Sequence, residues 1–235
     1  EAIYRIDQWC ADYEEKIRNM GGIGFFLGGI GPDGHIAFNI RGSNHNSTTR
    51  LLETNFETQA AAATDLGGIE ISRNRLVITI GLGTITFNPD AVAIILAAGE
   101  AKAGIVKKSL EKKEDVKYPA TVLARLKNSR FYLTTGASKK LKDTYNRYWT
   151  STKWNINKEQ KALLNLSKKE NIFGKKLKVS DLKKDPICQN IPNLNDKTVS
   201  RIIKKIDEKV QRGTDTEKNQ TYYHTGPHHD DIMLG

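Results

Sequence analysis

GGIGPDGHIAFN, residues 28–39, is the segment that decides the fold. It follows an apolar run, residues 23–27, that predicts a buried strand, and its glycines and proline predict a sharp turn where that strand ends. Ligands bind at this edge of open α/β sheets. Asp33 and His35 stand two residues apart in the turn, and a carboxylate beside an imidazole suits acid–base chemistry near neutral pH. A turn-stabilising Asp33 with a packed His35 is the structural alternative.

The same residues resemble the signature of the glucosamine-6-phosphate deaminase (isomerase) family. Its members convert glucosamine 6-phosphate and water to fructose 6-phosphate and ammonia. Residues 36–39, Ile-Ala-Phe-Asn, favour this family over the related 6-phosphogluconolactonases, which share only the Gly-x-Asp-Gly-His portion. The resemblance covers roughly residues 1–145 and continues in the family's order through Ser43, Thr49-Arg50, and residues 78–84, 97–102 and 119–121.

The resemblance implies an α/β fold for residues 1–145, as part of a doubly wound parallel sheet that is Rossmann-like and of the deaminase/isomerase type. It also implies that Glu1 falls near the middle of that fold, so that an N-terminal half with the phosphate loop and the acidic base is missing from this chain. The residue pattern independently alternates between strands and helices, which favours α/β. It predicts helices over 2–19, 56–64, 99–110 and 120–126, and strands over 23–27, 76–80, 92–96 and 130–134.

The strands over 76–80 and 92–96 are nearly continuous apolar runs. Such runs are expected in a parallel sheet that is covered on both faces. We therefore expect both segments to lie in one parallel sheet.

The resemblance carries family roles over to six positions of this sequence. His35 is expected to move a proton between the pyranose ring oxygen and the anomeric hydroxyl, and Asp33 to orient and support its imidazole. Lys102, at a predicted helix start, and Gly34 in the turn are expected to bind the substrate and its phosphate. A solvated Lys102 is the alternative. Ser43 and Arg50 match positions that bind an effector's phosphate at a subunit interface in allosteric members, and such an interface implies a homo-oligomer.

Three positions depart from the family pattern. Ile40 stands where the family has the Glu that completes an acid–histidine–acid relay, and Thr64 where it has an Arg that contacts the substrate phosphate. Leu52 replaces a basic residue of the effector site. A non-catalytic sugar-phosphate-binding module, attached to a zinc-dependent deacetylase, is therefore the alternative to a glucosamine-6-phosphate deaminase.

Basic residues crowd residues 139–218 and account for most of the net charge of +10. We expect residues 146–220 to form a lysine-rich helical connector, with an amphipathic helix over 198–210. Nucleic-acid binding is a third hypothesis. Aromatic residues are sparse after Trp154 and acidic residues are interspersed, so the pattern favours solvated helices over a nucleic-acid partner.

The two cysteines, Cys10 and Cys188, form no disulfide or zinc-binding pattern. This usage is typical of a reducing, cytoplasmic environment. Apolar runs stay well below the roughly 20 residues that a membrane-spanning helix needs, so no membrane partner is expected.

The C-terminal residues 221–235 carry a second motif. Residues 221–224 predict a short strand, the first of a second α/β domain. The following Gly-Pro-His-His-Asp-Asp-Ile-Met-Leu-Gly resembles the opening motif of the zinc-dependent N-acetylglucosaminyl de-N-acetylases. The resemblance implies that His228 and Asp231 ligate zinc and that Asp230 acts as a base on metal-bound water. The third ligand lies far downstream in that family, so this site is incomplete; no cofactor is expected for residues 1–145. A chance His/Asp cluster is the alternative.

Overall fold

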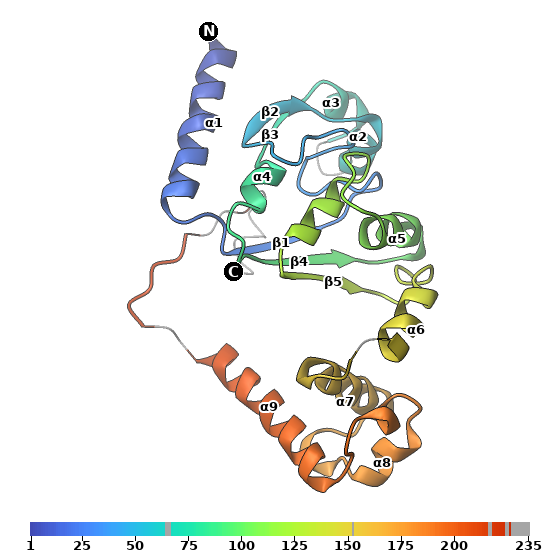
Figure 1. Cartoon of the computed structure of the whole chain (residues 1–235). Coiled ribbons are helices and arrows are strands. Elements are labelled where there is room, and N and C mark those ends of the chain that lie inside the picture. The colour runs from blue at the N-terminus through green and yellow to red at the C-terminus, as the bar shows by residue number, and fades with distance from the viewer. Residues whose placement is uncertain (64–66, 152, 216–217, 224–225, 227–235) are drawn as a thin grey trace. The chain divides into compact units, whose positions relative to one another are not determined.

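The computed structural model describes residues 1–63, 67–151, 153–215, 218–223 and 226 (Figure 1). The chain divides into two compact units, Glu1–Asn146 and Arg147–Gly235. Each unit has a hydrophobic core of its own.

A three-stranded parallel sheet organises the first unit. Its strands are β1 (Phe25–Gly29), β4 (Val92–Ala97) and β5 (Asn128–Leu133), in the order β1-β4-β5. They run side by side in Figure 1. The predictions of an α/β fold, a parallel sheet and strands near 23–27, 92–96 and 130–134 are confirmed.

The strand predicted over residues 76–80 exists, but its place in the parallel sheet was wrong. It forms β3 (Leu76–Thr79), which pairs antiparallel with β2 (Arg50–Glu53) in a separate two-stranded sheet. Leu76 and Ile78 are 49% and 45% exposed, so the run is not buried on both faces. An apolar run of this length shows that a strand forms but not which strand it pairs with.

The helices of the first unit follow the sequence pattern closely at the chain's start and less closely further on. α1 (Ala2–Asn19) is followed by Gly21 and Gly22, whose φ angles of 91° and 88° suit glycine. The helix predicted over 120–126 is a 3₁₀ helix that begins at a proline. The remaining helices are α2 (Phe56–Ala62), α3 (Ile69–Arg73), α4 (Leu82–Ile85), η1 (Glu100–Lys102), α5 (Ala103–Glu111) and η2 (Pro119–Arg125).

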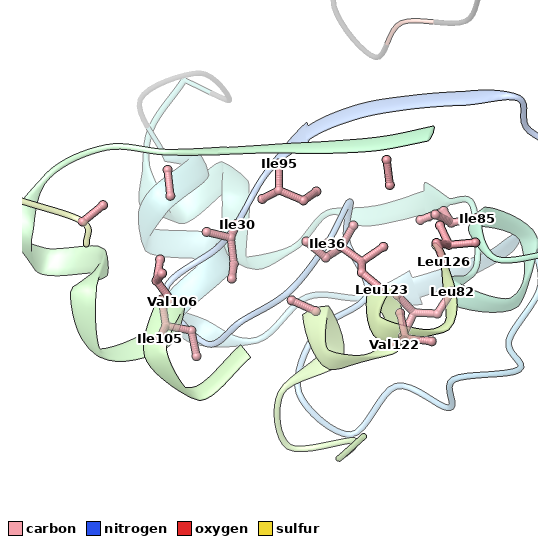
Figure 2. Close-up of a cluster of buried hydrophobic side chains, with 14 of the residues drawn as sticks. Ile30, Ile36, Leu82, Ile85, Ile95, Ile105, Val106, Val122, Leu123 and Leu126 are labelled. Atoms are coloured by element: carbon pink, nitrogen blue, oxygen red, sulfur yellow. The ribbon is translucent and has the colours of Figure 1, made fainter. Parts of the chain in front are cut away.

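One face of the parallel sheet forms the core of the first unit. Figure 2 shows Ile36, which is fully buried, among side chains from β4 (Ile95), α5 (Val106) and η2 (Leu123). Residues on the opposite face of the sheet are more than half exposed in this chain: Phe25, Leu27, Leu96 and Tyr132. Ile30 and Ile36, which flank the turn after β1, both belong to this core.

Glu14 fastens α1 to the rest of the first unit. The residue is 6% exposed, and its carboxylate accepts hydrogen bonds from the amide and hydroxyl of Thr49 and from the hydroxyl of Thr84, at 2.7–3.2 Å. Arg18 donates a further bond at 2.9 Å. Burial raises the pKa of Glu14, but these hydrogen bonds outweigh it and hold the pKa below its ordinary value.

The second unit is helical. Its buried residues include Leu163, Leu166, Leu182 and Ile202, so the residues predicted to form a connector have a core of their own. The helix predicted over 198–210 is present as α9 and is longer than expected. The elements are α6 (Lys142–Ser151), which crosses the unit boundary, α7 (Ile156–Glu170), η3 (Gly174–Lys176), α8 (Val179–Lys184), η4 (Cys188–Asn190) and α9 (Asp196–Thr214).

The end of the chain is described only in part. Thr221–Tyr223 do not form the predicted strand. His224 and residues 227–235 lie outside the described residues. Within the described part of the chain, no helix combines the length and the apolar character needed to cross a membrane.

Candidate active site

The turn after β1 is built by its own backbone. The Gly31 amide donates to the His35 carbonyl and the Gly34 amide to the Gly31 carbonyl, both at 3.0 Å. Gly34 has a φ of 90°, which only glycine adopts without strain. The preceding Ile30 is 4% exposed and anchors the turn in the core. These contacts place residues 31–35 at the carboxyl end of a parallel strand.

Asp33 and His35 form a close pair in this turn. Asp33 Oδ1 lies 2.6 Å from His35 Nδ1, and Asp33 Oδ2 accepts from the Arg41 amide at 3.0 Å and from Asn55 Nδ2 at 2.7 Å. Asp33 is 1% exposed. Burial raises the pKa of Asp33, but the hydrogen bonds from His35, Arg41 and Asn55 outweigh it, so the pKa lies well below its ordinary value. The carboxylate is therefore ionised at neutral pH and acts as an acceptor.

The imidazole of His35 lies against the backbone of Gly31. A Cβ atom at position 31 would stand 1.9–2.2 Å from three ring atoms, so only glycine leaves room for the ring. The side chain is 14% exposed. No described residue forms a hydrogen bond with Nε2 of His35. This atom is not among the fully buried side-chain atoms without a partner, so it is not sealed off from solvent. The nitrogen opposite the Asp33 pair is thus free to meet a ligand.

Two residues of this site were missed by the sequence analysis. Asn55 caps the N-terminus of α2 and also bonds Asp33, while the Thr58 hydroxyl lies 3.2 Å from His35 Nδ1. An Asn followed three residues later by Thr, ahead of an alanine-rich run, is a helix-start signal. That signal was available in the sequence, but it does not say that the cap faces an acid.

Gly34 lies in the turn after β1, and Lys102 contacts that turn. Lys102, the last residue of η1, donates from Nζ to the Ile30 carbonyl at 2.7 Å, which places its ammonium at the turn after β1. Burial lowers the pKa of Lys102, and the nearby Asp33 charge opposes that shift. The Gly34 amide and carbonyl bond Gly31 and Ala120. Substrate contacts by Lys102 and Gly34 stay predictions.

Ser43 and Arg50, predicted to bind an effector phosphate, are brought together. Arg50 donates to Ser43 Oγ at 3.1 Å and to Asn39 Oδ1 at 2.9 Å. Asn39 is fully buried and donates to two main-chain carbonyls. Burial lowers the pKa of Arg50. The cluster is fixed by protein contacts, and its effector role stays a prediction.

A second acid–imidazole pair lies outside the turn. His45 is 6% exposed, and its Nδ1 stands 2.8 Å from Glu114 Oε1. Glu114 also pairs with Arg125, whose hydrogen bonds lower the pKa of the Glu114 carboxyl below its ordinary value. His45 Nε2 is buried and has no partner among the residues that the structure describes. This pair therefore offers no accessible nitrogen.

The predicted zinc site cannot be placed. His228, Asp230 and Asp231 lie outside the described residues, and within the described ranges no group of three or more His, Cys, Asp and Glu side chains could hold a metal. The second unit has an open groove of about 480 Å³ that is lined partly by α9. Its lining contains both lysines and aspartates. The zinc and nucleic-acid predictions are not tested by these residues.

The first unit thus combines a parallel sheet with an acid–imidazole pair at the carboxyl end of a strand, an arrangement found in α/β enzymes. No family model matches the chain. It is 40% identical over 118 residues to a glucosamine-6-phosphate isomerase of Candida albicans, covering 50% of this chain and 48% of the relative. It is 34% identical over 137 residues to a glucosamine-6-phosphate deaminase of Borreliella afzelii, covering 58% and 50%.

A solved structure supports the same relationship. The structure of a monomeric glucosamine-6-phosphate deaminase matches with a TM-score of 0.52 and 28% identity, over 57% of this chain and 54% of that one. The chain spans about half the length of the curated relatives named above. The relatives and the structural neighbour support the glucosamine-6-phosphate deaminase (isomerase) family for the matched part of the chain.

Proposed function

We propose that the unit Glu1–Asn146 belongs to a glucosamine-6-phosphate deaminase and that its own part in the reaction is to open the sugar ring. The observation that carries the proposal is the 2.6 Å contact between Asp33 Oδ1 and His35 Nδ1, with Nε2 left accessible. The likeness to glucosamine-6-phosphate deaminases over half of the chain supplies the substrate class.

The proton movement follows from which ring nitrogen is engaged. With Nδ1 held by a carboxylate, Nε2 carries a lone pair that accepts the proton of the anomeric hydroxyl. The bond between the anomeric carbon and the ring oxygen then breaks, and the ring oxygen takes the proton from Nε2. Asp33 stabilises the imidazolium formed between these transfers. The imidazole is regenerated, and the open-chain sugar is ready for isomerisation and release of ammonia.

Lys102 supplies the charge for the phosphate in this proposal. One of its three protons goes to the Ile30 carbonyl, and two remain for an anion. Lys102 is also the N-cap residue of α5, and the first main-chain amides of a helix favour negative charge. A sugar phosphate bound here would lie beside the turn that holds His35.

The test has two assays. With glucosamine 6-phosphate, the whole protein that contains this chain should release ammonia and form fructose 6-phosphate. Separately, the 235-residue chain should speed the exchange between the α and β anomers of the sugar phosphate, measured by NMR exchange spectroscopy. Anomer exchange needs only ring opening and therefore tests His35 without the later steps. If neither ammonia release nor anomer exchange occurs, the proposal fails.

Lys102→Met tests the phosphate contact. Losing one charged hydrogen bond costs about 1.5–3 kcal/mol, so KM should rise by roughly 10- to 100-fold. Lys107→Met is the matched control, because Lys107 lies on α5, which Lys102 caps, and pairs with Glu111 at 3.7 Å. Equal KM values for the two variants would remove Lys102 from the site. Binding of the sugar phosphate without any turnover would instead favour a non-catalytic module.

A further inference from the structure

The first turn of α2 fixes the orientation of the Asn55 amide. Asn55 Oδ1 accepts from the Thr58 amide at 3.0 Å and from the Thr58 hydroxyl at 2.6 Å. The bond from the Thr58 amide is that of a helix N-cap, and it requires an oxygen at this position because a backbone amide can only donate. The NH₂ end of the side chain must therefore point the other way.

That NH₂ end meets the acid of the candidate site. Asn55 Nδ2 donates to Asp33 Oδ2 at 2.7 Å, across 22 residues of sequence. A flipped amide would set its oxygen against the carboxylate and its NH₂ against the Thr58 amide, so the hydrogen-bond network admits one orientation only. The helix cap and the carboxylate thus share one side chain.

Thr58 settles which nitrogen of His35 carries the proton. A hydroxyl has one proton, and that of Thr58 goes to Asn55 Oδ1. The Thr58 oxygen, 3.2 Å from His35 Nδ1, can then only accept. Asp33 Oδ1, on the other side of Nδ1, also accepts. Two acceptors around Nδ1 require a proton on it, which leaves the lone pair on Nε2.

The position of α2 is itself secured away from the site. Gln59 Nε2 donates to the Thr54 carbonyl at 2.7 Å, and the Ser72 hydroxyl donates to the Gln59 carbonyl at 2.8 Å. Thr58 is 2% exposed. Ile40 has no oxygen to hold the ring, so bracing by polar side chains comes from Asp33 and from α2.

From these contacts we propose that Asn55 and Thr58 are positioning residues: the N-cap of α2 holds Asp33 and His35 in the tautomer with Nδ1 protonated and Nε2 able to accept a proton. The inference rests on the proposed ring opening for its consequence in catalysis. The tautomer itself can be measured without any substrate.

The decisive variant is Asn55→Asp, which keeps an oxygen for the cap but replaces the donor to Asp33 by a second carboxylate. We expect His35 to stay protonated to a pH about one to two units higher than in the wild type, because the added negative charge favours the imidazolium. Imidazole ¹⁵N NMR over a pH titration measures this. In the whole protein, the acidic limb of the kcat profile should move up by the same amount.

Asn195→Asp is the matched control. Asn195 caps α9 with the same spacing, accepting from the Thr198 amide at 3.0 Å, and α9 belongs to the second unit. The His35 titration should be unchanged in this variant. Equal titrations for Asn55→Asp and Asn195→Asp would overturn the proposal.

Thr58 is tested by the tautomer. In wild type, ¹⁵N shifts above the titration range should show Nδ1 protonated and Nε2 bare. Thr58→Val should raise the population of the other tautomer, and Thr58→Ser should restore the wild-type spectrum. A spectrum unchanged by Thr58→Val would exclude Thr58 from this role. If the spectra behave as expected but no anomer exchange occurs, the proposed function fails while the positioning network stands.

Discussion

Two histidines of the first unit each hold Nδ1 against a carboxylate, and they differ in the fate of the other nitrogen. His35 stands 2.6 Å from Asp33 and leaves Nε2 accessible, whereas His45 stands 2.8 Å from Glu114 and buries Nε2 without a partner. The pairing with an acid is therefore not what marks a reactive histidine. Access to the second nitrogen separates a group that can transfer protons from one that holds a loop in place.

The largest expected effect separates the two histidines directly. His35→Asn should slow anomer exchange by about 10²- to 10⁴-fold, the usual contribution of a general acid–base group. His45→Asn should leave exchange nearly unchanged and lower the free energy of unfolding by about 1–3 kcal/mol, because a buried group loses its partner. NMR exchange spectroscopy and urea unfolding measure the two quantities. Equal losses of anomer exchange in both variants would contradict the assignment of proton transfer to His35 alone of the two histidines.

Gly31→Ala tests whether the position of the His35 ring matters, without changing the histidine itself. The new methyl group would stand within 2.2 Å of the His35 ring, so the ring must turn away from Asp33 while the chain can keep its fold. We expect at least a tenfold loss of anomer exchange, from misplacement of the reacting group. Unchanged exchange with an intact fold would mean that the ring position is unimportant. Gly24→Ala, where the added Cβ meets nothing within 4 Å, is the control.

The N-caps of α2 and α9, Asn55 and Asn195, can be compared by what each contributes to the free energy of unfolding. Asn55→Ala should cost about 2–3 kcal/mol, since it removes a cap worth about 1 kcal/mol and a hydrogen bond to a buried carboxylate. Asn195→Ala should cost about 1 kcal/mol, because its cap faces no acid among the described residues. Unfolding of each unit, followed by NMR signals from its own residues, gives the difference. Equal costs would show that the Asp33 contact adds nothing to stability.

Acid should weaken the first unit through its buried carboxylates. The pKa values of Glu14 and Asp33 are lowered in the folded state, so both stabilise the fold above the unfolded-state pKa values of about 4.3 and 3.9. This stabilisation declines as the pH falls below those values, and it is lost as the pH reaches the lower folded-state pKa values. Urea unfolding at about pH 7, 5 and 3.5 should show it, with a shallower decline in Glu14→Gln. Identical pH slopes in both proteins would exclude Glu14 from the effect.

The elements with a strong local pattern were predictable from the sequence. α1 and α9 carry apolar residues at helical spacing, and β1, β4 and β5 are compact apolar runs. β2 was missed because Arg50–Glu53 has a charge at each end and only two apolar residues. β3 was found but given the wrong sheet, since strand partners are chosen by tertiary packing.

The residues of the candidate site also differ in whether the sequence could predict them. Asp33 and His35 were found because they share one short turn, whereas Asn55 and Thr58 reach them from a helix about twenty residues further along the chain. The helix-start pattern at Asn55 gives the cap but not the neighbour that its amide would meet. The core of the second unit was hidden because its lysines dominate the composition of residues 147–214.

The shared side chain of Asn55 gives the molecule a reporter of its own. The Thr58 amide donates to Asn55 Oδ1, and the same side chain donates from Nδ2 to Asp33. Deuterium uptake at that single amide therefore registers any loosening of the acid–imidazole pair. A ligand that settles against His35 would be visible as slower uptake there, before a single molecule of product had formed.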